Sequence, residues 1–231
     1  MTATSQWYDE FYGDGFTEDS PWYAAALQWL TSSRVNGSLL ELGCGRGKLL
    51  VELARRELFK DSELYGIEQS SIAIQRASEL LPNVSVGNIE HSLPFPDSKF
   101  SVIVMTEVVE HLLQPWAVLS EIRRVLRDDG KLLISFPNYL NLPWLGVRVL
   151  AELLDRPSWI VLQPVDHMFI YPIFRKKLQA CGFDVDRVIG SVYFPPVLYR
   201  WEPRPITKLL NELRLGPLSL HPLLVCSPRP Q

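Results

Sequence analysis

Three glycines at alternate positions, Gly43, Gly45 and Gly47, form the part of this 231-residue chain that is best suited to hold a ligand. They follow an apolar run that indicates a buried strand (residues 39–42) and precede a segment with helical periodicity (residues 48–54). A glycine turn between a strand and a helix lets a ligand approach the backbone, and the free N–H groups at the helix start face that ligand. The pattern predicts a site for an anion or a nucleotide.

An acidic residue follows the next apolar stretch. Residues 64–67 indicate a second strand, and Glu68 comes directly after them. A carboxylate at the end of the second strand of such a unit is placed to accept hydrogen bonds from both ribose hydroxyls. The glycine spacing differs from the G-x-G-x-x-G of dinucleotide sites. A G-x-x-x-x-G-K-[ST] phosphate loop is excluded because Leu42 and Leu49 occupy its first and last positions. We therefore predict nucleoside binding.

The E-x-G-x-G-x-G pattern that begins at Glu41, with Glu68 downstream, resembles the class I S-adenosylmethionine-dependent methyltransferases. The resemblance covers residues 39–225 and is strongest up to residue 138. It implies that the glycine loop and Glu41 hold the methionine part of S-adenosyl-L-methionine and that Glu68 holds its ribose. The alternative is a tight turn in another doubly wound domain.

A third loop resembles the G-D-x-x-x-L-P-F stretch of the same family, whose acidic side chain takes the adenine amino group. Here the loop contains Gly87-Asn88-Ile89 and then Leu93-Pro94-Phe95. Asn88 stands where the family has Asp, and its amide oxygen can accept the same hydrogen bond. The resemblance therefore assigns Asn88 and Ile89 to cofactor binding. The alternative is that Asn88 is a turn residue after glycine.

A fourth loop, residues 106–112, follows an apolar strand at residues 100–105, and Thr106 at its start is expected to face the cofactor. If the loop is helical, Glu107, Glu110 and His111 fall at i, i+3 and i+4 on one face. Two carboxylates and an imidazole at the end of this strand would lie next to the transferable methyl group. They could bind a divalent metal, or His111 could act as a general base.

The E-x-x-E-H segment resembles the metal site of two methyltransferase branches, the ubiquinone-pathway O-methyltransferases and the small-RNA 3′-terminal 2′-O-methyltransferases. The second branch adds a histidine within Asp-His-x-Phe, and His167 stands in such a segment here. The resemblance implies Mg²⁺ or another divalent metal held by Glu107, Glu110, His111 and His167. In the alternative, the carboxylates are solvated or cap backbone N–H groups, and His111 packs under the cofactor.

Composition limits the class of protein. With 47% hydrophobic residues, the chain can form one domain with a full core, and we expect a single domain over residues 1–231. A net charge of −3 makes nucleic acid an unlikely partner. The three cysteines lack C-x-x-C spacing and suggest neither a disulfide framework nor a zinc site. No run approaches the ~18 apolar residues of a membrane span, and no signal peptide is evident, so a cytoplasmic protein is the default.

The order of the elements predicts the fold. Further strands are expected near residues 84–86 and 131–136, and helices at 72–80, 118–126 and 172–180, with the middle helix ended by Asp128-Asp129-Gly130. Alternating strands and helices predict a parallel Rossmann-like sheet with helices on both faces. The resemblance implies seven strands, with residues 183–189 and 223–226 as an antiparallel pair at one edge. The aromatic-rich residues 1–36 and an insertion at 139–165 are expected to act as lids.

The sequence favours a methyltransferase that uses S-adenosyl-L-methionine, acting on oxygen of a small, largely apolar acceptor. An apolar insertion with Trp144 and Trp159 and a pI near 5.8 support this acceptor class. One alternative is a 3′-terminal 2′-O-methyltransferase of RNA. The sequence does not indicate the basic surface that binding to an RNA backbone needs. Another is a non-catalytic, methyltransferase-like partner subunit. The oligomeric state is not indicated by the sequence.

Overall fold

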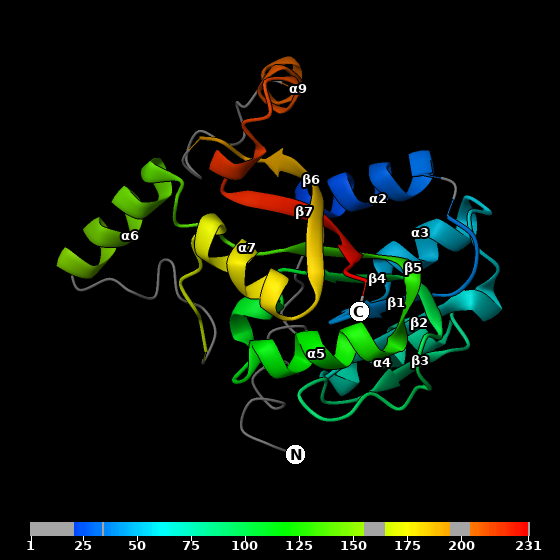
Figure 1. Cartoon of the computed structure of the whole chain (residues 1–231). Coiled ribbons are helices and arrows are strands. Elements are labelled where there is room, and N and C mark those ends of the chain that lie inside the picture. Colours follow the sequence, from blue (N-terminus) through cyan, green and yellow to red (C-terminus); the bar gives the residue numbers. More distant parts are fainter. Residues whose placement is uncertain (1–20, 34, 155–164, 195–203, 231) are drawn as a thin grey trace.

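The computed structural model describes residues 21–33, 35–154, 165–194 and 204–230, and they contain one seven-stranded sheet (Figure 1). The strand order is β3-β2-β1-β4-β5-β7-β6. In chain order the strands are β1 (Leu39–Leu42), β2 (Leu64–Glu68), β3 (Val84–Val86), β4 (Phe100–Thr106), β5 (Leu126–Ser135), β6 (Phe183–Ser191) and β7 (His221–Pro228). Strands β1 to β5 are parallel, and β7 is antiparallel to both of its neighbours.

Helices cover both faces of this sheet. The helices of the described residues are α2 (Pro21–Ser33), α3 (Lys48–Arg55), α4 (Ser71–Ser78), α5 (Pro115–Val125), α6 (Leu142–Leu153), α7 (Tyr171–Ala180) and α9 (Arg204–Glu212). On one face, apolar residues of α2, α3 and α4 form a core with β1, β2 and β4. On the other face, α5 and α7 pack on the same sheet. The predicted Rossmann-like fold, with its antiparallel last strand, is confirmed.

The fold places the carboxyl ends of β1 and β4 side by side. The strand order runs outward in opposite directions from β1 and β4, which pair with each other from Leu39↔Val102 to Glu41↔Val104. In open parallel sheets, ligands bind outside the carboxyl ends of the strands where the order reverses. The glycine turn after β1 and the loop after β4 meet at this point. Strand β4 is buried from Phe100 to Met105, as expected for a strand that is covered on both faces.

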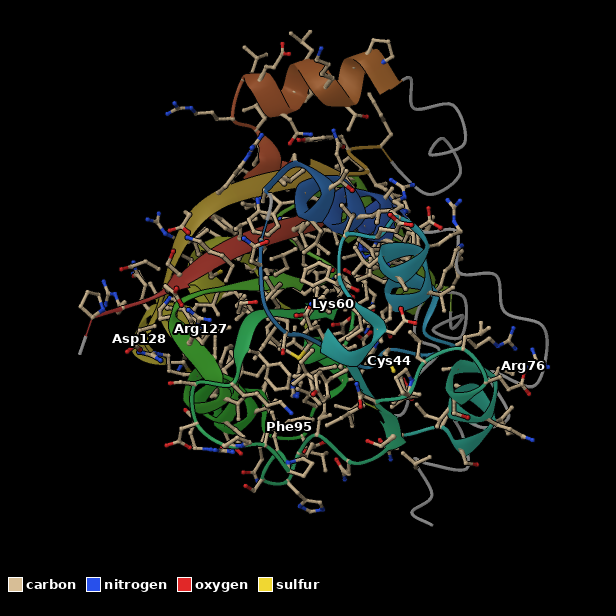
Figure 2. The ribbon with its side chains drawn as sticks, turned by 90° about the vertical axis from the view of Figure 1, so that its right-hand side faces the viewer. Cys44, Lys60, Arg76, Phe95, Arg127 and Asp128 are labelled. Carbon is tan, nitrogen blue, oxygen red and sulfur yellow. The ribbon has the colours of Figure 1, made fainter. Side chains whose placement is uncertain are left out.

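One predicted boundary is wrong. Asp128-Asp129-Gly130 does not end a helix, because α5 ends at Val125 and β5 begins at Leu126. Leu126 pairs with Phe100, and pairing resumes at Lys131 opposite Val102, so residues 127–130 form a bulge within β5. Proline at the first turn of α5, rather than the later apolar residues, marks the helix start. Arg127 and Asp128 of this bulge lie on the opposite side of the molecule from Arg76 in α4 (Figure 2).

The two expected lid segments are described in part. Of residues 1–36, helix α2 packs through Ala26, Leu27 and Leu30 against the sheet, and residues 1–20 and 34 lie outside the described residues. Of the insertion at 139–165, helix α6 is described and extends away from the sheet (Figure 1), and residues 155–164, with Trp159, lie outside. Within the described ranges, no helix has the length and apolar character needed to cross a membrane.

Candidate cofactor and acceptor site

The glycine turn after β1 has backbone angles that residues other than glycine rarely adopt. Gly43, Gly45 and Gly47 have φ angles of 70°, 52° and 72°. A Cβ atom on Gly43 would lie 2.5 Å from Cγ2 of Val108, so the turn abuts the loop after β4. Gly47 precedes the first turn of α3 and supplies no side-chain cap. The turn therefore leads directly into the N-terminus of α3, the end of a helix that favours negatively charged groups.

Glu68 ties the second strand end to this turn. Its Oε2 accepts a hydrogen bond from the Gly45 N–H at 3.0 Å. Its Oε1 accepts from the N–H groups of Gln69 at 2.7 Å and Ser70 at 2.9 Å. The side chain is 5% exposed. The carboxylate thus has a fixed orientation beside the glycine turn, which is the arrangement predicted for a ribose acceptor.

The other predicted cofactor residues have different surroundings. Glu41 is buried within β1, and Ile89 is buried in the core below the third loop. Asn88 is exposed, and its Oδ1 accepts a hydrogen bond from the Glu90 N–H at 2.9 Å, as in an Asx turn. Thr106 is half-buried at the end of β4, opposite Ser135 of β5. Their contacts with a cofactor stay predictions.

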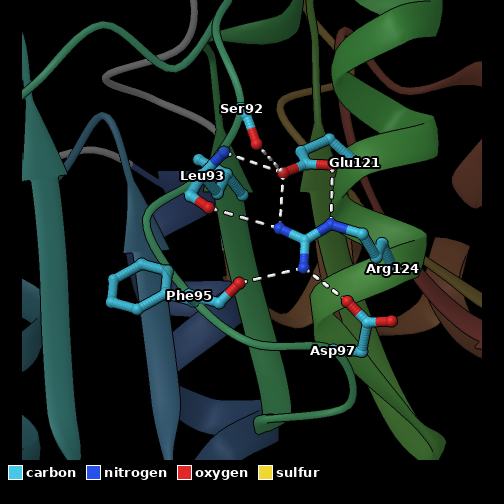
Figure 3. A network of polar contacts seen from close by, with 6 residues as sticks. All are labelled: Ser92, Leu93, Phe95, Asp97, Glu121 and Arg124. Carbon is cyan, nitrogen blue, oxygen red and sulfur yellow. Dashed lines mark hydrogen bonds and ion pairs between the residues drawn. The ribbon is translucent and has the colours of Figure 1, made fainter.

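An ion-pair network fixes the third loop to α5 (Figure 3). Arg124 donates to Glu121 at 2.6 and 2.9 Å, to Asp97 at 2.6 Å and to the backbone oxygen of Phe95 at 2.9 Å. Glu121 in turn accepts from the Leu93 N–H at 2.8 Å. The hydrogen bonds to Arg124 lower the pKa of Glu121 to about 2. The loop expected to bind adenine is therefore held by charged groups that the sequence analysis did not select.

The loop after β4 does not have the predicted helical face. A single 3-10 turn, η2, covers Val109–His111, and Glu107 lies before it with φ 54°. The Glu107 N–H donates to the backbone oxygen of Ser135 at 3.2 Å, so the residue still belongs to the strand end. The prediction that Glu107, Glu110 and His111 share one face of a helix is therefore wrong.

Glu107 instead forms a polar cluster with two residues on neighbouring strands. Its Oε1 accepts from the Ser135 hydroxyl at 2.7 Å, and its Oε2 lies 2.7 Å from Nδ1 of His221. The Glu107 and His221 side chains are 13% and 15% exposed. The Trp22 ring packs on the imidazole of His221 with 4.4 Å between ring centroids. These contacts lie at the carboxyl ends of β4 and β5.

Glu110 and His111 form a second, more deeply buried pair. Glu110 is 1% exposed, and its Oε2 has no hydrogen-bond partner within the described part of the chain. Burial, reinforced by the charge of Glu107, raises the pKa of Glu110 well above its ordinary value. His111 Nδ1 lies 2.7 Å from the Val165 oxygen, and its Nε2 lies 3.4 Å from Oε1 of Glu110. Burial lowers the pKa of His111, so both groups favour their neutral forms.

The four predicted metal ligands do not meet at one point. His167 does fold back over the loop after β4, because its backbone N–H donates to the backbone oxygen of Glu110 at 2.8 Å. Its ring Nε2, however, lies 2.9 Å from the backbone oxygen of Leu112. The Glu107 oxygens and His111 Nδ1 have the other partners given above. Across residues 21–33, 35–154, 165–194 and 204–230, no three His, Cys, Asp or Glu side chains are grouped to hold a metal ion. The donor set does not fit the predicted divalent metal.

Sequence reasoning missed His221 and Ser135. Both are near strand ends, but His221 is 114 positions after Glu107, and the intervening Pro-rich segment gave no register for β7. The signal that could have found His221 is its place two positions before the apolar run 223–226, next to an expected edge strand. Antiparallel pairing of such a strand brings its first residue to the carboxyl end of β5.

Comparison with known proteins finds methyltransferases that are similar to the region of the glycine turn. Residues 40–134 match the family model described as a methyltransferase domain. A probable S-adenosylmethionine-dependent methyltransferase of Mycolicibacterium smegmatis is 32% identical over 133 residues, covering 55% of this chain and 49% of that protein. The 2-phytyl-1,4-naphtoquinone methyltransferase of Trichormus variabilis is 31% identical over 117 residues, covering 48% of this chain and 50% of that protein. The chain spans about half the length of these relatives.

Solved structures show the same fold at low sequence identity. The methyltransferase bound to the Trm112 methyltransferase activator of Haloferax volcanii superposes with a TM-score of 0.66 at 18% identity, covering 97% of this chain and 98% of that chain. This coverage includes the edge strands β6 and β7, which lie outside the matched family segment.

Proposed function

We propose that this chain is a class I S-adenosylmethionine-dependent methyltransferase that transfers the methyl group of S-adenosyl-L-methionine to oxygen of a small, largely apolar acceptor. The match of residues 40–134 to a methyltransferase domain and the order of the strands support this proposal. One observation carries the proposal: the turn of three positive-φ glycines lies next to the Glu68 carboxylate and leads into the N-terminus of α3. The backbone turn would receive the methionine part and Glu68 the ribose. Glu41, Asn88, Ile89 and Thr106 complete the proposed cofactor set.

The chemistry requires alignment rather than activation of the methyl donor. The sulfonium is already electrophilic, so the protein must place an oxygen behind the methyl group, exclude water and accept one proton. Glu107, Glu110 and His111 form the proposed wall on the acceptor side. Glu110 and His111 would contribute neutral, hydrogen-bonding groups, because burial shifts their pKa values in opposite directions. No metal enters this proposal, since Glu107, His111 and His167, three of the four side chains expected to hold one, have other partners.

Helix α6 supports an apolar acceptor. Its outer face exposes Leu142, Leu150 and Leu153, which are 73%, 54% and 78% accessible. Its Arg148 points inward instead, with 15% of the side chain exposed and an ion pair to Asp166 at 3.3 Å. An exposed leucine face on a helix that extends away from the sheet suits contact with an apolar molecule. The naphthoquinone specificity in the name of one relative agrees with this class.

A screen of purified protein tests the proposal. Turnover of S-adenosyl-L-methionine would be measured with alkylphenols, quinols, lipids and RNA, each with and without EDTA. We expect methylation of a phenol or quinol that persists in EDTA. Methylation of RNA alone would favour the 3′-terminal 2′-O-methyltransferase. Loss of activity in EDTA would favour a metal-dependent reaction.

A partner subunit is the second candidate function. The structurally similar Haloferax protein is itself found in a complex with a methyltransferase activator. Turnover by a complex with a co-purifying protein that persists when Gly45→Val disrupts the cofactor turn of this chain would favour a non-catalytic role.

A further inference from the structure

We propose that His221 is the proton acceptor of the reaction and that Glu107 positions it. This inference rests on the proposed function, because it concerns the acceptor hydroxyl of the same site. The two side chains come from strands far apart in the sequence, β7 and the end of β4, yet His221 Nδ1 and Glu107 Oε2 are 2.7 Å apart. A carboxylate that holds one imidazole nitrogen leaves the other nitrogen to act as a base.

The position of the pair matches the reacting end of the site. Glu107 directly follows β4, and the next residue, Val108, abuts Gly43 of the glycine turn. His221 begins β7, whose pairing with β5 starts at Leu223↔Ser135. His221 therefore lies beyond the carboxyl end of β5, on the edge of the sheet where the cofactor turn is found. The pair stands between that turn and the edge strands.

Three contacts fix the orientation of the pair. The Ser135 hydroxyl donates to Oε1 of Glu107, which leaves Oε2 for the imidazole. The carboxylate accepts the Nδ1 proton, and this assigns the Nε2 lone pair as the free basic position. Within the described part of the chain, Nε2 of His221 forms no hydrogen bond. The Trp22 ring covers one face of the imidazole and shields it from water.

Glu107 also has an unusual backbone, which is consistent with a functional position. Its φ of 54° is in the left-handed region, where a residue with a long side chain is uncommon. This conformation follows directly from the two bonds of its N–H to Ser135, one to the backbone oxygen and one to Oγ, each at 3.2 Å. The strand end is thus shaped to aim the carboxylate at β7.

The step balances as follows. A lone pair of the acceptor oxygen forms the O–C bond to the methyl group while the C–S bond breaks, and that electron pair stays on sulfur in S-adenosylhomocysteine. The hydroxyl proton moves to Nε2 of His221, and the imidazolium is stabilised by Glu107. Release of the proton to water after product departure restores the neutral imidazole.

The test uses a substitution that keeps the contact with Glu107. His221→Asn retains an N–H donor near the position of Nδ1 and removes Nε2. The probes are an alkylphenol, whose hydroxyl is neutral at the assay pH, and a nitrophenol, which is already ionised. We expect kcat for the alkylphenol to fall by about 10²- to 10⁴-fold, the usual contribution of general base catalysis, and kcat for the nitrophenol to fall far less. Affinity for S-adenosylhomocysteine should be unchanged.

Two further variants complete the design. Lys176→Asn is the control, because Lys176 is an exposed residue of α7 outside the proposed site, and its kinetics should equal those of the wild type. Glu107→Gln should lower kcat for the alkylphenol more than for the nitrophenol, since it weakens the acidic partner of the imidazole. Equal losses for both phenols, or no loss in His221→Asn, would overturn the proposal. Absence of wild-type turnover with either phenol would instead count against oxygen methylation itself, and the base would be rejected with it.

Discussion

Replacing Glu68 by alanine is expected to weaken cofactor binding strongly. The carboxylate is proposed to accept hydrogen bonds from both ribose hydroxyls, and a hydrogen bond to a charged group is worth about 1.5–3 kcal/mol. Loss of that acceptor predicts a dissociation constant for S-adenosylhomocysteine about 10- to 150-fold higher, at about 1.4 kcal/mol for each factor of ten.

The same change removes structural contacts, which must be measured separately. Glu68 accepts hydrogen bonds from three backbone N–H groups, including that of Gly45, and is 5% exposed. Leaving such donors without their acceptor costs about 1–3 kcal/mol of folding stability. Glu68→Gln keeps one acceptor oxygen but places an NH₂ group against an N–H donor. We therefore expect Glu68→Gln to lose less affinity than Glu68→Ala.

The assay is isothermal titration calorimetry with S-adenosylhomocysteine, at a temperature at which circular dichroism shows each variant to be folded. Glu79→Ala is the matched control, because Glu79 is an exposed glutamate at the end of α4 and should bind like the wild type. A folded Glu68→Ala protein with an unchanged dissociation constant would refute the placement of the ribose at the end of β2.

Three other predictions concern the supports of the site. Arg124→Met should lower the free energy of unfolding by about 1–3 kcal/mol. Each kcal/mol corresponds to a fall in Tm of about 2–4 °C. A Tm equal to that of the wild type in differential scanning calorimetry would contradict the network of Figure 3. Because the pKa of Glu121 is lowered from 4.5 to about 2 in the folded protein, its contribution is present above pH 4.5 and is lost as the pH falls through about 2. Acid titration of stability should therefore be shallower in Glu121→Gln over this window, and identical curves would be inconsistent with the shift. Gly43→Ala should destabilise the protein, since its Cβ would lie 2.5 Å from Val108 Cγ2, and Val108→Ala should recover part of the loss; no recovery would mean that backbone strain alone is responsible.

The parts of the structure that depend on local pattern were predictable from the sequence. The glycine turn, Glu68 and the buried strand β4 follow from spacing within a few residues, and the parallel sheet follows from alternating elements. The start of α5 at Pro115 and the bulge at residues 127–130 were not predicted, because pairing with β4 outweighs the turn preference of Asp128-Asp129-Gly130.

The acceptor side was less predictable, because its contacts join distant parts of the chain. The E-x-x-E-H spacing implied one helical face, but hydrogen bonds from Glu107 to Ser135 keep that residue in the strand end. The partner of Glu107 is His221, whose place is set by β7 pairing and by no local motif. The residues that hold the loop expected to bind adenine, Glu121 and Arg124, were not selected from the sequence, because their partners Leu93, Phe95 and Asp97 lie 24 or more positions before them.

Equilibrium binding of S-adenosylhomocysteine to the wild type and to Gly45→Val tests the central claim most directly. Gly45 has φ 52°, and its N–H donates to Glu68, so a β-branched side chain there should distort the turn and fill the space of the cofactor. Gly146→Ala is the control glycine substitution, because its Cβ would meet nothing within 4 Å. We predict one-to-one binding by the wild type and by Gly146→Ala, and none by a folded Gly45→Val protein. Normal affinity in Gly45→Val, or no binding by the wild type, would contradict the cofactor site.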